Sequence, residues 1–437
     1  MIQSITAAES EVAQRRIAGA LRSAGIVEGD RVVLSLAGSP DYVNAVLGAT
    51  RSGIVPVPVD PRLTDFEVAQ IIDDVEPALV IDRAEQLEEL AGGPEAELAE
   101  WPRCRPMHFT SGTTGRPKGV WSGLLSSDDA RRLALEERDL WGFATSDVNL
   151  VVSPVYHSAP LRFATGTLLA GGSIVVLPKF EPEPFVEAVE RFRPTTMFCV
   201  PAHLQRLFAW QDASGDTRPV DSFRLVAHAG APCPDPVRRR AHDTFGVDAV
   251  WEFYGSTEGQ WTACPAMDWI DHPGTVGRAR PGRTISADAD GLLWCSVPPW
   301  ATFEYWRDPD KTAAAWKDTG EGRAFTVGDL GRVEAGWVYL DARRTDLIIT
   351  GGVNVYPAEV ESVLADVPGL VEVAAFGRDD ERWGQRVCAA YVGDVDEDAL
   401  RARASERLAP PKRPKEYVKL DSLPRTATGK VRRRELP

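Results

Sequence analysis

Hydroxyl side chains, glycines and one lysine are concentrated in a single stretch, Thr-Ser-Gly-Thr-Thr-Gly-Arg-Pro-Lys-Gly-Val, at residues 110–120. Because glycine has no Cβ, backbone N–H groups there can approach an anion closely, and hydroxyl groups and a compact ammonium group add further donors. These groups suit a polyphosphate, so ATP is the first candidate ligand, although the spacing is not that of a Walker A loop. A solvated linker of the same composition is the alternative. The candidate phosphate-binding residues are Thr110, Ser111, Gly112, Thr113, Thr114, Gly115 and Lys118.

Further motifs follow in order along the chain. They are Tyr254-Gly-Ser-Thr-Glu258-Gly, Thr326-Val-Gly-Asp329-Leu-Gly, the run from Ala342 to Glu361, and Pro424-Arg-Thr-Ala-Thr-Gly-Lys430. Together with the 110–120 stretch, they resemble the motifs of the adenylate-forming superfamily, which comprises acyl-CoA synthetases, adenylation domains of peptide synthetases and beetle luciferases. The resemblance covers nearly the whole chain. Several motifs in the family's order are far more specific than one glycine-rich loop, which argues against the linker.

The resemblance implies a reaction in which a carboxylate attacks the α-phosphate of ATP and releases pyrophosphate. In that reaction the 110–119 loop holds the β- and γ-phosphates with the help of Lys118. Thr257 contacts the α-phosphate, and Glu258 helps to hold Mg²⁺, an ion that prefers oxygen ligands and keeps several waters. A surface carboxylate beside a glycine turn is the alternative for Glu258.

A second set of residues matches those that hold the nucleoside. Tyr254 matches the residue that packs on adenine, Asp329 the aspartate that accepts hydrogen bonds from both ribose hydroxyls, and Arg343 an arginine that supports the ribose and the phosphate. Taken alone, Tyr254 could be a core tyrosine and Arg343 part of a surface ion pair. The other residues that the resemblance assigns to this site are Gly230, Ala231, Pro232, Gly255 and Ser256.

Two more residues match groups close to the reacting atoms. Lys430 matches the lysine that a mobile C-terminal domain inserts between the carboxylate and the α-phosphate, although the basic residues after it also suit a solvated tail. His157 falls where the family has a histidine or an aromatic residue at the gate of the acyl pocket. A lone histidine in an apolar run is often structural. The predicted catalytic residues are therefore Lys430, Lys118, Glu258, Thr257 and His157.

The segment 351–361 resembles acyl-CoA synthetases more than peptide-synthetase domains, which predicts transfer of the acyl group to coenzyme A. Gly351 and Gly352 would leave the backbone narrow enough for a pantetheine arm to pass. The basic loop 412–415 could meet CoA phosphates or be an ordinary surface loop. Two alternatives remain: an enzyme that loads a carrier protein or another acceptor, and a non-catalytic nucleotide-binding relative. Thr345 stands where the family usually has Asp or Lys at the hinge, so the hinge mechanics are an open question.

Helical apolar patterns alternate with short strand-like runs, which predicts an α/β fold. We expect a large N-terminal domain, residues 1–342, of mixed, largely parallel sheets flanked by helices, and a small mobile α+β domain, residues 343–437. The chain begins later than most members of the family, so we expect part of the N-terminal subdomain to be missing or rebuilt.

The composition narrows the partners of this 437-residue chain. Its formal net charge of −15 argues against nucleic acid, whose phosphates select basic surfaces. The six cysteines form no Cys-x-x-Cys pair, and the chain has neither a signal-peptide pattern nor an apolar run long enough for a membrane span. We therefore expect a cytoplasmic monomer or homodimer.

The residues expected around the acyl pocket mix aromatic and polar side chains, which favours a small or medium carboxylic acid as the substrate. These candidate pocket walls are Tyr156, His157, Phe198, Val200, His203, His228, Ala229, Gly230, Trp251, Gln260 and Trp261.

Overall fold

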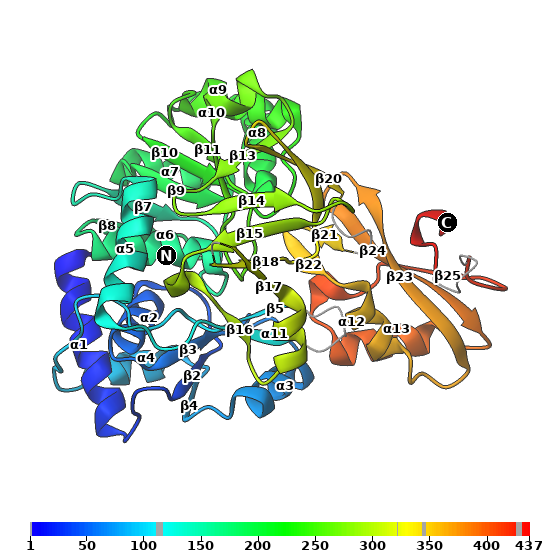
Figure 1. Cartoon of the computed structure of the whole chain (residues 1–437), viewed down its shortest axis with the longest axis horizontal. Coiled ribbons are helices and arrows are strands. Elements are labelled where there is room, and N and C mark those ends of the chain that lie inside the picture. The colour runs from blue at the N-terminus through cyan, green and yellow to red at the C-terminus, as the bar shows by residue number, and fades with distance from the viewer. Residues whose placement is uncertain (1, 111–116, 321, 343–346, 425–430) are drawn as a thin grey trace.

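A computed structural model describes residues 2–110, 117–320, 322–342, 347–424 and 431–437. A large N-terminal part and a smaller C-terminal part lie side by side (Figure 1). The predicted residues Ser111–Gly115, Arg343, Thr345 and Lys430 lie outside the described ranges.

The first unit of the chain is a parallel three-stranded sheet with helices around it. The strands are ordered β3 (Val55–Pro58), β2 (Arg31–Leu34) and β4 (Leu79–Ile81). The accompanying helices are α1 (Ala7–Ser23), α2 (Pro40–Arg51), α3 (Asp65–Val75) and α4 (Ala84–Ala91). A capping box starts α3, because Thr64 accepts from the Glu67 N–H and the Glu67 carboxylate accepts from the Thr64 N–H.

A ten-stranded mixed sheet forms the centre of the molecule, in the order β1-β8-β7-β9-β10-β11-β12-β13-β20-β19. The run from β8 to β11 is parallel, and the pairs outside it are antiparallel. Its strands are β1 (Gln3–Thr6), β7 (Val148–Val151), β8 (Ser173–Val176), β9 (Thr196–Cys199), β10 (Leu225–His228), β11 (Val250–Glu252), β12 (Thr262–Pro265), β13 (Thr275–Ala279), β19 (Leu330–Glu334) and β20 (Trp337–Ala342).

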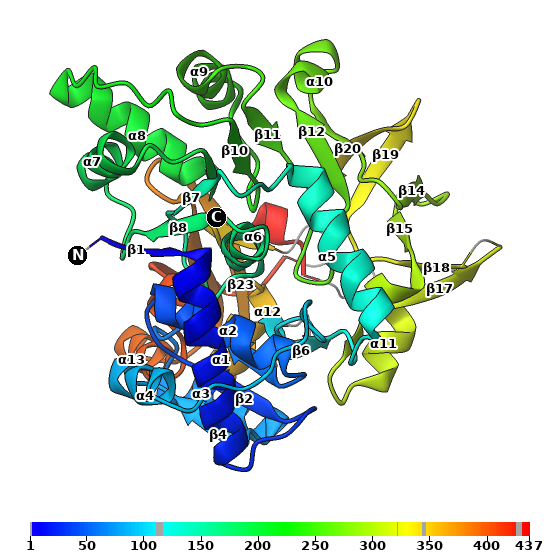
Figure 2. The same cartoon turned by 90° about the vertical axis from the view of Figure 1, so that its left-hand side faces the viewer.

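Helices cover both faces of the parallel part of this sheet. Successive strand residues point to opposite faces, and both sets are apolar, so each face needs a cover. Val151 and Val176 pack in the core with α1 and α2, whereas Leu150 and Val175 pack in a second core with α7 and α8. Figure 2 shows α1, α6 and α5 side by side across one face. These helices are α5 (Ser127–Trp141), α6 (Ser158–Leu169), α7 (Pro182–Phe192), α8 (Pro201–Ser214), α9 (Asp235–Phe245) and α10 (Ala266–Asp271).

Two small antiparallel sheets complete the N-terminal part. The first has the order β16-β6-β5, with β5 (His108–Thr110) paired to β6 (Lys118–Trp121), so Thr110 and Lys118 face each other at the ends of two strands. We expected both residues within one loop. The second has the order β14-β15-β18-β17 and was not predicted from the sequence. The remaining elements are β14 (Thr284–Ala287), β15 (Leu293–Val297), η1 (Pro299–Ala301), β16 (Glu304–Tyr305), α11 (Pro309–Ala315), β17 (Trp316–Thr319) and β18 (Gly322–Phe325).

The C-terminal part has its own α+β core, in which residues of two helices pack on one sheet: Val360, Leu364 and Leu400 contact Val387 and Ala389. This part has the α+β composition that the sequence predicted. The elements are β21 (Ile348–Thr350), β22 (Val353–Val355), α12 (Pro357–Leu364), β23 (Leu370–Asp380), β24 (Gly384–Gly393), α13 (Glu397–Arg407), η2 (Pro410–Lys412), β25 (Glu416–Lys419) and η3 (Arg433–Glu435).

The structure also bears on two expectations drawn from composition. All six cysteines are buried and unpaired. Among the described residues, no helix combines the length and the apolar character that a bilayer crossing requires.

Candidate active site

A cleft of about 720 Å³ lies between the N-terminal and C-terminal parts and brings many of the predicted residues together. From the N-terminal part it is lined by Thr110, His157, Ser256, Thr257, Glu258 and Asp329. From the C-terminal part it is lined by Leu347, Gly352, Val353, Asn354, Tyr356 and Lys412.

A tight turn between β11 and β12 presents Thr257 and Glu258 to this cleft. Gly255 forms an isolated bridge with Gln260, and the Ser256 N–H donates to the Gly259 carbonyl oxygen over 2.9 Å. A Cβ at Gly255 would lie 2.8 Å from that same oxygen, so the chain can fold back only with glycine there.

The Glu258 carboxylate is buried at 6% exposure and is held from one side. The Tyr305 hydroxyl donates to Glu258 Oε1 over 2.8 Å, and Lys311 Nζ lies 3.9 Å from the centre of the Tyr305 ring. Burial, together with the Glu258 charge, raises the pKa of Tyr305 above its ordinary value, so the hydroxyl stays protonated and donates. Tyr305 was not predicted from the sequence.

The donor set suits a metal ion that takes few protein ligands. Among the described residues, no three His, Cys, Asp or Glu side chains converge to hold an ion. Mg²⁺ in phosphate-binding sites uses one or two carboxylates and completes its shell with phosphate oxygens and water. A single buried carboxylate such as Glu258 fits that requirement.

Asp329, also buried, receives a hydrogen bond from the Tyr254 hydroxyl. Tyr254 is 5% exposed and packs on Trp261, with ring centres 5.4 Å apart. Asp329 lines the cleft, whereas Tyr254 lines neither this cleft nor the smaller cavity described below. Tyr254 therefore orients the carboxylate, and its packing on adenine stays a prediction.

Lys118 begins strand β6 and lies beside an acidic partner. Its Nζ is 3.5 Å from Asp308 Oδ2, and both side chains are mostly shielded from solvent. Burial lowers the pKa of the neighbouring Lys311, an effect that Glu258 and Asp308 oppose and Lys118 reinforces. Two cations, Lys118 and Lys311, and two carboxylates, Glu258 and Asp308, therefore interact electrostatically at this place.

A second, smaller cavity of about 190 Å³ adjoins the same turn. It shares His108, Ser158 and residues 256–258 with the cleft. Its other walls come from α2, α5 and α6, from residues 101–106, and from residues of the segments 280–301 and β18. The position beside Thr257 and Glu258 makes this cavity the candidate acyl pocket.

Two histidines lie where the cleft and the cavity meet. His157 is exposed to the cleft. Desolvation by the surrounding protein nevertheless lowers its pKa below the ordinary value. The charge of Asp60 opposes this shift, and the charge of Arg62 adds to it. Burial and His157 lower the pKa of His108 to about 3, and His108 Nδ1 lies 3.1 Å from the Tyr156 carbonyl oxygen. Both rings are neutral at physiological pH. His108 was not predicted, although it comes two residues before the phosphate-binding stretch.

The expectation for the pocket walls was partly wrong. Tyr156 and His157 line the cleft, and Gln260 lines the small cavity. Phe198 and His228 are instead packed in the interior, since β9 and β10 lie in the middle of the central sheet. Trp261 is buried in another core cluster, with Tyr254 and Phe325. Gly230, Ala231 and Pro232 line neither space.

The Gly351-Gly352 turn joins β21 to β22 and approaches the N-terminal part closely. Both glycines have positive φ, 57° and 81°, which strains other residues. A Cβ at Gly352 would lie 3.7 Å from Val200 Cγ2, so the backbone of this turn lies against Val200 of the N-terminal part, and Gly352 also lines the cleft.

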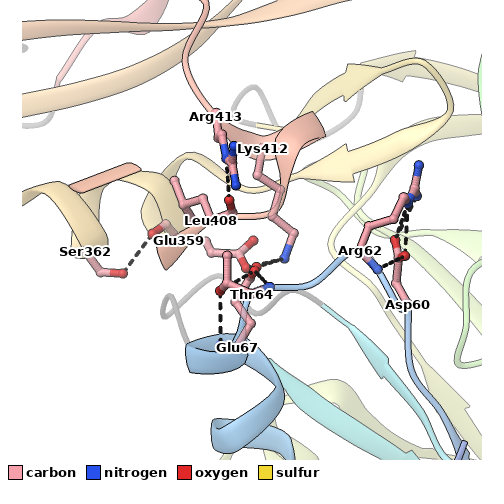
Figure 3. A network of polar contacts seen from close by, with 9 residues as sticks. All are labelled: Asp60, Arg62, Thr64, Glu67, Glu359, Ser362, Leu408, Lys412 and Arg413. Atoms are coloured by element: carbon pink, nitrogen blue, oxygen red, sulfur yellow. Dashed lines mark hydrogen bonds and ion pairs between the residues drawn. The ribbon is translucent and has the colours of Figure 1, made fainter. Parts of the chain in front are cut away.

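The basic loop 412–415 is engaged within the protein. Figure 3 shows Lys412 between two carboxylates, with Nζ 2.8 Å from Glu67 Oε1 and 2.6 Å from Glu359 Oε1. Arg413 donates to the carbonyl groups of Leu408 and Ser405. The expectation that this loop could meet CoA phosphates is therefore wrong for Lys412, because its charge is already neutralised.

Comparison with known protein families and proteins matches both parts of the chain. The family described as AMP-binding enzyme matches residues 2–291, and the AMP-binding enzyme C-terminal domain matches residues 359–430. An indoleacetate–CoA ligase from Aromatoleum aromaticum is 31% identical over 96% of this chain and 90% of its own length. A fatty acid–[acyl-carrier-protein] ligase, ScoC, from Streptomyces coeruleorubidus is 32% identical over 96% of this chain and 89% of its own length.

Among solved structures, the o-succinylbenzoate CoA synthetase of Bacillus subtilis is 25% identical and matches in two complexes. A double mutant with a product analogue, OSB-NCoA, gives a TM-score of 0.86. The enzyme with the acyl-adenylate intermediate OSB-AMP gives 0.68. Each alignment covers 98% of this chain and 92% of the other.

Proposed function

The chain belongs to the AMP-binding enzyme family of adenylate-forming acid ligases, and on that premise we propose that it converts a carboxylic acid and ATP to an acyl-adenylate and then to an acyl-CoA thioester. The observation that carries the proposal is the single cleft in which Thr257, Glu258 and Asp329 face Gly352 of the C-terminal part.

In the first step the carboxylate oxygen attacks the α-phosphorus of ATP, and the bond to the leaving pyrophosphate breaks. Thr257 faces the α-phosphate, and Asp329 accepts hydrogen bonds from the ribose hydroxyls. Lys118 and the 110–115 stretch hold the β- and γ-phosphates. Because charge develops on the phosphate oxygens, donors and cations that are already in place lower the barrier.

Glu258 would hold Mg²⁺, whose charge offsets that of the phosphates when it is bound. Tyr305 fixes the orientation of this carboxylate through its 2.8 Å hydrogen bond. Lys430, from outside the described ranges, is the residue we assign to the reacting carboxylate and α-phosphate.

In the second step the CoA thiolate attacks the acyl carbonyl carbon and AMP leaves. The proposal that the described arrangement belongs to this step rests on the two complexes of the Bacillus subtilis enzyme. Their folds are those of one enzyme, so the difference between TM-scores of 0.86 and 0.68 reflects how their parts are arranged. The Gly351-Gly352 turn facing the cleft would leave room for a pantetheine arm.

A carrier protein is the second candidate acceptor, because ScoC is a ligase for an acyl carrier protein. The acyl-adenylate should be formed first, freed of ATP, and then mixed with either CoA or a phosphopantetheinylated carrier protein. Rapid discharge by CoA, detected as the thioester by mass spectrometry, would support the proposal. If the carrier protein discharged the adenylate and CoA did not, the carrier protein would be the acceptor in place of CoA.

A further inference from the structure

Several arginines contribute to the polar lining of the small cavity beside the Ser256–Glu258 turn. Arg105 approaches it just before β5, Arg162 from α6, and Arg280 and Arg283 from the chain that follows β13. The side chains of Arg280 and Arg283 are only 4% and 5% exposed, and guanidinium groups buried to this degree are uncommon without paired carboxylates.

Three of these arginines share two carboxylates of helix α5. Arg280 Nη1 lies 2.6 Å from Glu137 Oε1, and Arg162 Nε lies 3.3 Å from Glu137 Oε2. Arg283 Nη2 lies 2.8 Å from Glu136 Oε2. Three cations therefore face two anions, so the group as a whole is positive.

Arg105 adds a further positive charge that has no such partner. Among the described residues, the hydrogen bonds of its two Nη atoms go to the backbone carbonyl oxygens of Glu258 and Thr302, each at 3.4 Å. Within the described ranges, no carboxylate oxygen lies within the 4.0 Å ion-pair distance of its guanidinium group. An arginine side chain keeps its charge at neutral pH, and the carboxylates of Glu137 and Glu258 line the same cavity beyond that distance.

Apart from the arginines, the small cavity has apolar walls together with polar groups that include Glu137, Glu258 and Gln260. Val46 from α2, Leu133 from α5, Leu161 from α6 and Phe325 from β18 contribute to its walls. Its volume of about 190 Å³ is comparable with the roughly 150 Å³ of an engineered cavity that binds benzene. One aromatic ring or a short aliphatic chain fits this space.

We propose that the acid activated by this enzyme carries a second carboxylate, which Arg105 binds in this cavity while the first carboxylate reacts at the nucleotide. The acid is thus a small dicarboxylate with an aromatic or short aliphatic spacer. This inference rests on the function proposed above and names the substrate class of that same site.

The expected selectivity follows from the cost of burying an unpaired charge. A monocarboxylate of the same size would leave Arg105 without a counter-ion after water has been displaced. Sites built to pair a polar group of the substrate reject analogues that lack it, because their own buried group is left unsatisfied.

The test is acid-dependent ATP–pyrophosphate exchange with matched acids. The dicarboxylates are benzene-1,4-dicarboxylate and the straight-chain dioates from butanedioate to octanedioate. The monocarboxylates are 4-methylbenzoate and the corresponding alkanoates. The variants are Arg105→Gln and Arg105→Lys, with Arg31→Gln as the control, since Arg31 also donates to backbone carbonyl groups but lies outside the cavity.

We expect the wild-type enzyme to prefer one dicarboxylate over its matched monocarboxylate. Arg105→Gln should lower kcat/KM for that dicarboxylate about 10- to 100-fold and change it little for the monocarboxylate. Arg105→Lys should keep part of the preference, and Arg31→Gln all of it. A wild-type preference for monocarboxylates, or an equal loss for both classes in Arg105→Gln, would overturn the inference while the proposed function stood. Absence of exchange with every acid would instead overturn the proposed function.

Discussion

Lys412 of the C-terminal part forms an ion pair with Glu67 of the N-terminal part, with 2.8 Å between Nζ and Oε1. Glu359, also of the C-terminal part, holds the same ammonium group over 2.6 Å. Burial disfavours a charged lysine, but Glu359 and Glu67 outweigh it and raise the pKa of Lys412 above its ordinary value. One protonated lysine thus joins the two sides of the cleft in the described arrangement.

Replacing this lysine should affect one half-reaction more than the other. In Lys412→Met, Glu67 and Glu359 face each other without a cation, which costs about 3–5 kcal/mol in this arrangement. We expect slower thioester formation from a preformed adenylate and an unchanged or faster adenylation step, measured by single-turnover kinetics. Lys415→Met is the control, because among the described residues Lys415 Nζ donates to the Pro410 carbonyl oxygen and forms no ion pair with a carboxylate.

Glu67→Gln tests the same contact from the other side. Glutamine also serves at the third position of a capping box, so α3 keeps its start and only the charge is lost. The thioester step should slow in this variant as well. If both variants slowed the two half-reactions equally, the assignment of this contact to the thioester-forming arrangement would be wrong.

Tyr305→Phe should weaken the metal-dependent step without disturbing the fold. The change removes the hydrogen bond to Glu258 Oε1 and leaves the ring in its core with Phe303 and Trp316. A hydrogen bond to a charged group contributes about 1.5–3 kcal/mol, so kcat/KM for MgATP should fall roughly 10- to 100-fold. The measurement is pyrophosphate exchange over a range of Mg²⁺ concentrations.

Tyr417→Phe provides the matched control for Tyr305→Phe. The Tyr417 hydroxyl is buried in the C-terminal core and has no hydrogen-bond partner among the described residues. Its loss should leave MgATP kinetics unchanged. Equal kinetics for the two variants would remove Tyr305 from the metal site.

Glu137 predicts a pH dependence of stability. Burial raises its pKa, but Arg162 and Arg280 outweigh that effect and lower it from 4.5 to about 2. Because the pKa of Glu137 is lower in the folded state than in the unfolded chain, the ionised carboxylate stabilises the fold fully at pH values above 4.5. This stabilisation is lost as the pH falls toward 2. Between about pH 5 and pH 3 the loss is about 2 kcal/mol.

Glu137→Gln should therefore make the decline of unfolding free energy between those two pH values shallower by about that amount. Urea titrations followed by tryptophan fluorescence would measure it. Glu136 pairs with Arg283 and lies near Arg280, so Glu136→Gln provides a comparison. Parallel declines for the wild type and Glu137→Gln would contradict the depressed pKa.

Lys430→Ala should abolish adenylate formation and leave thioester formation from a preformed adenylate largely intact. A flexible point charge from the C-terminal part is needed only while charge develops at the α-phosphate. Pyrophosphate exchange and the discharge of purified adenylate by CoA would be measured on the same preparation. Equal loss of both steps would argue against two arrangements.

The sequence predicted the long, strongly periodic elements well. The helices of the first unit and the buried strands Arg31–Leu34 and Thr196–Cys199 follow from apolar residues at helical or strand spacing. The sheet β14-β15-β18-β17 was missed, because its short strands have a mixed burial pattern, whereas the equally short strands Arg31–Leu34 and Thr196–Cys199 are almost entirely buried. The pairing of Thr110 with Lys118 was also missed, because the two strands that flank the glycine-rich run have only three and four residues.

For the candidate site, the motifs predicted the groups and missed what holds them. Glu258 was found from its motif, but Tyr305 reaches it from a distant antiparallel sheet, and no local pattern encodes that contact. Arg105 and Arg283 belong to no motif, and the tertiary fold brings these two residues, far apart in the sequence, to one cavity. For Lys412 the sequence left two possibilities, contact with CoA phosphates or an ordinary surface loop, and no local pattern indicates its pairing with Glu67 and Glu359.

The measurement that tests the central claim most directly is ATP–pyrophosphate exchange that depends on an added carboxylic acid, with the wild type and Glu258→Ala compared. The account predicts exchange with at least one small or medium acid, and its loss in a folded Glu258→Ala variant. Exchange that is absent for every acid, or that persists unchanged in Glu258→Ala, would contradict it.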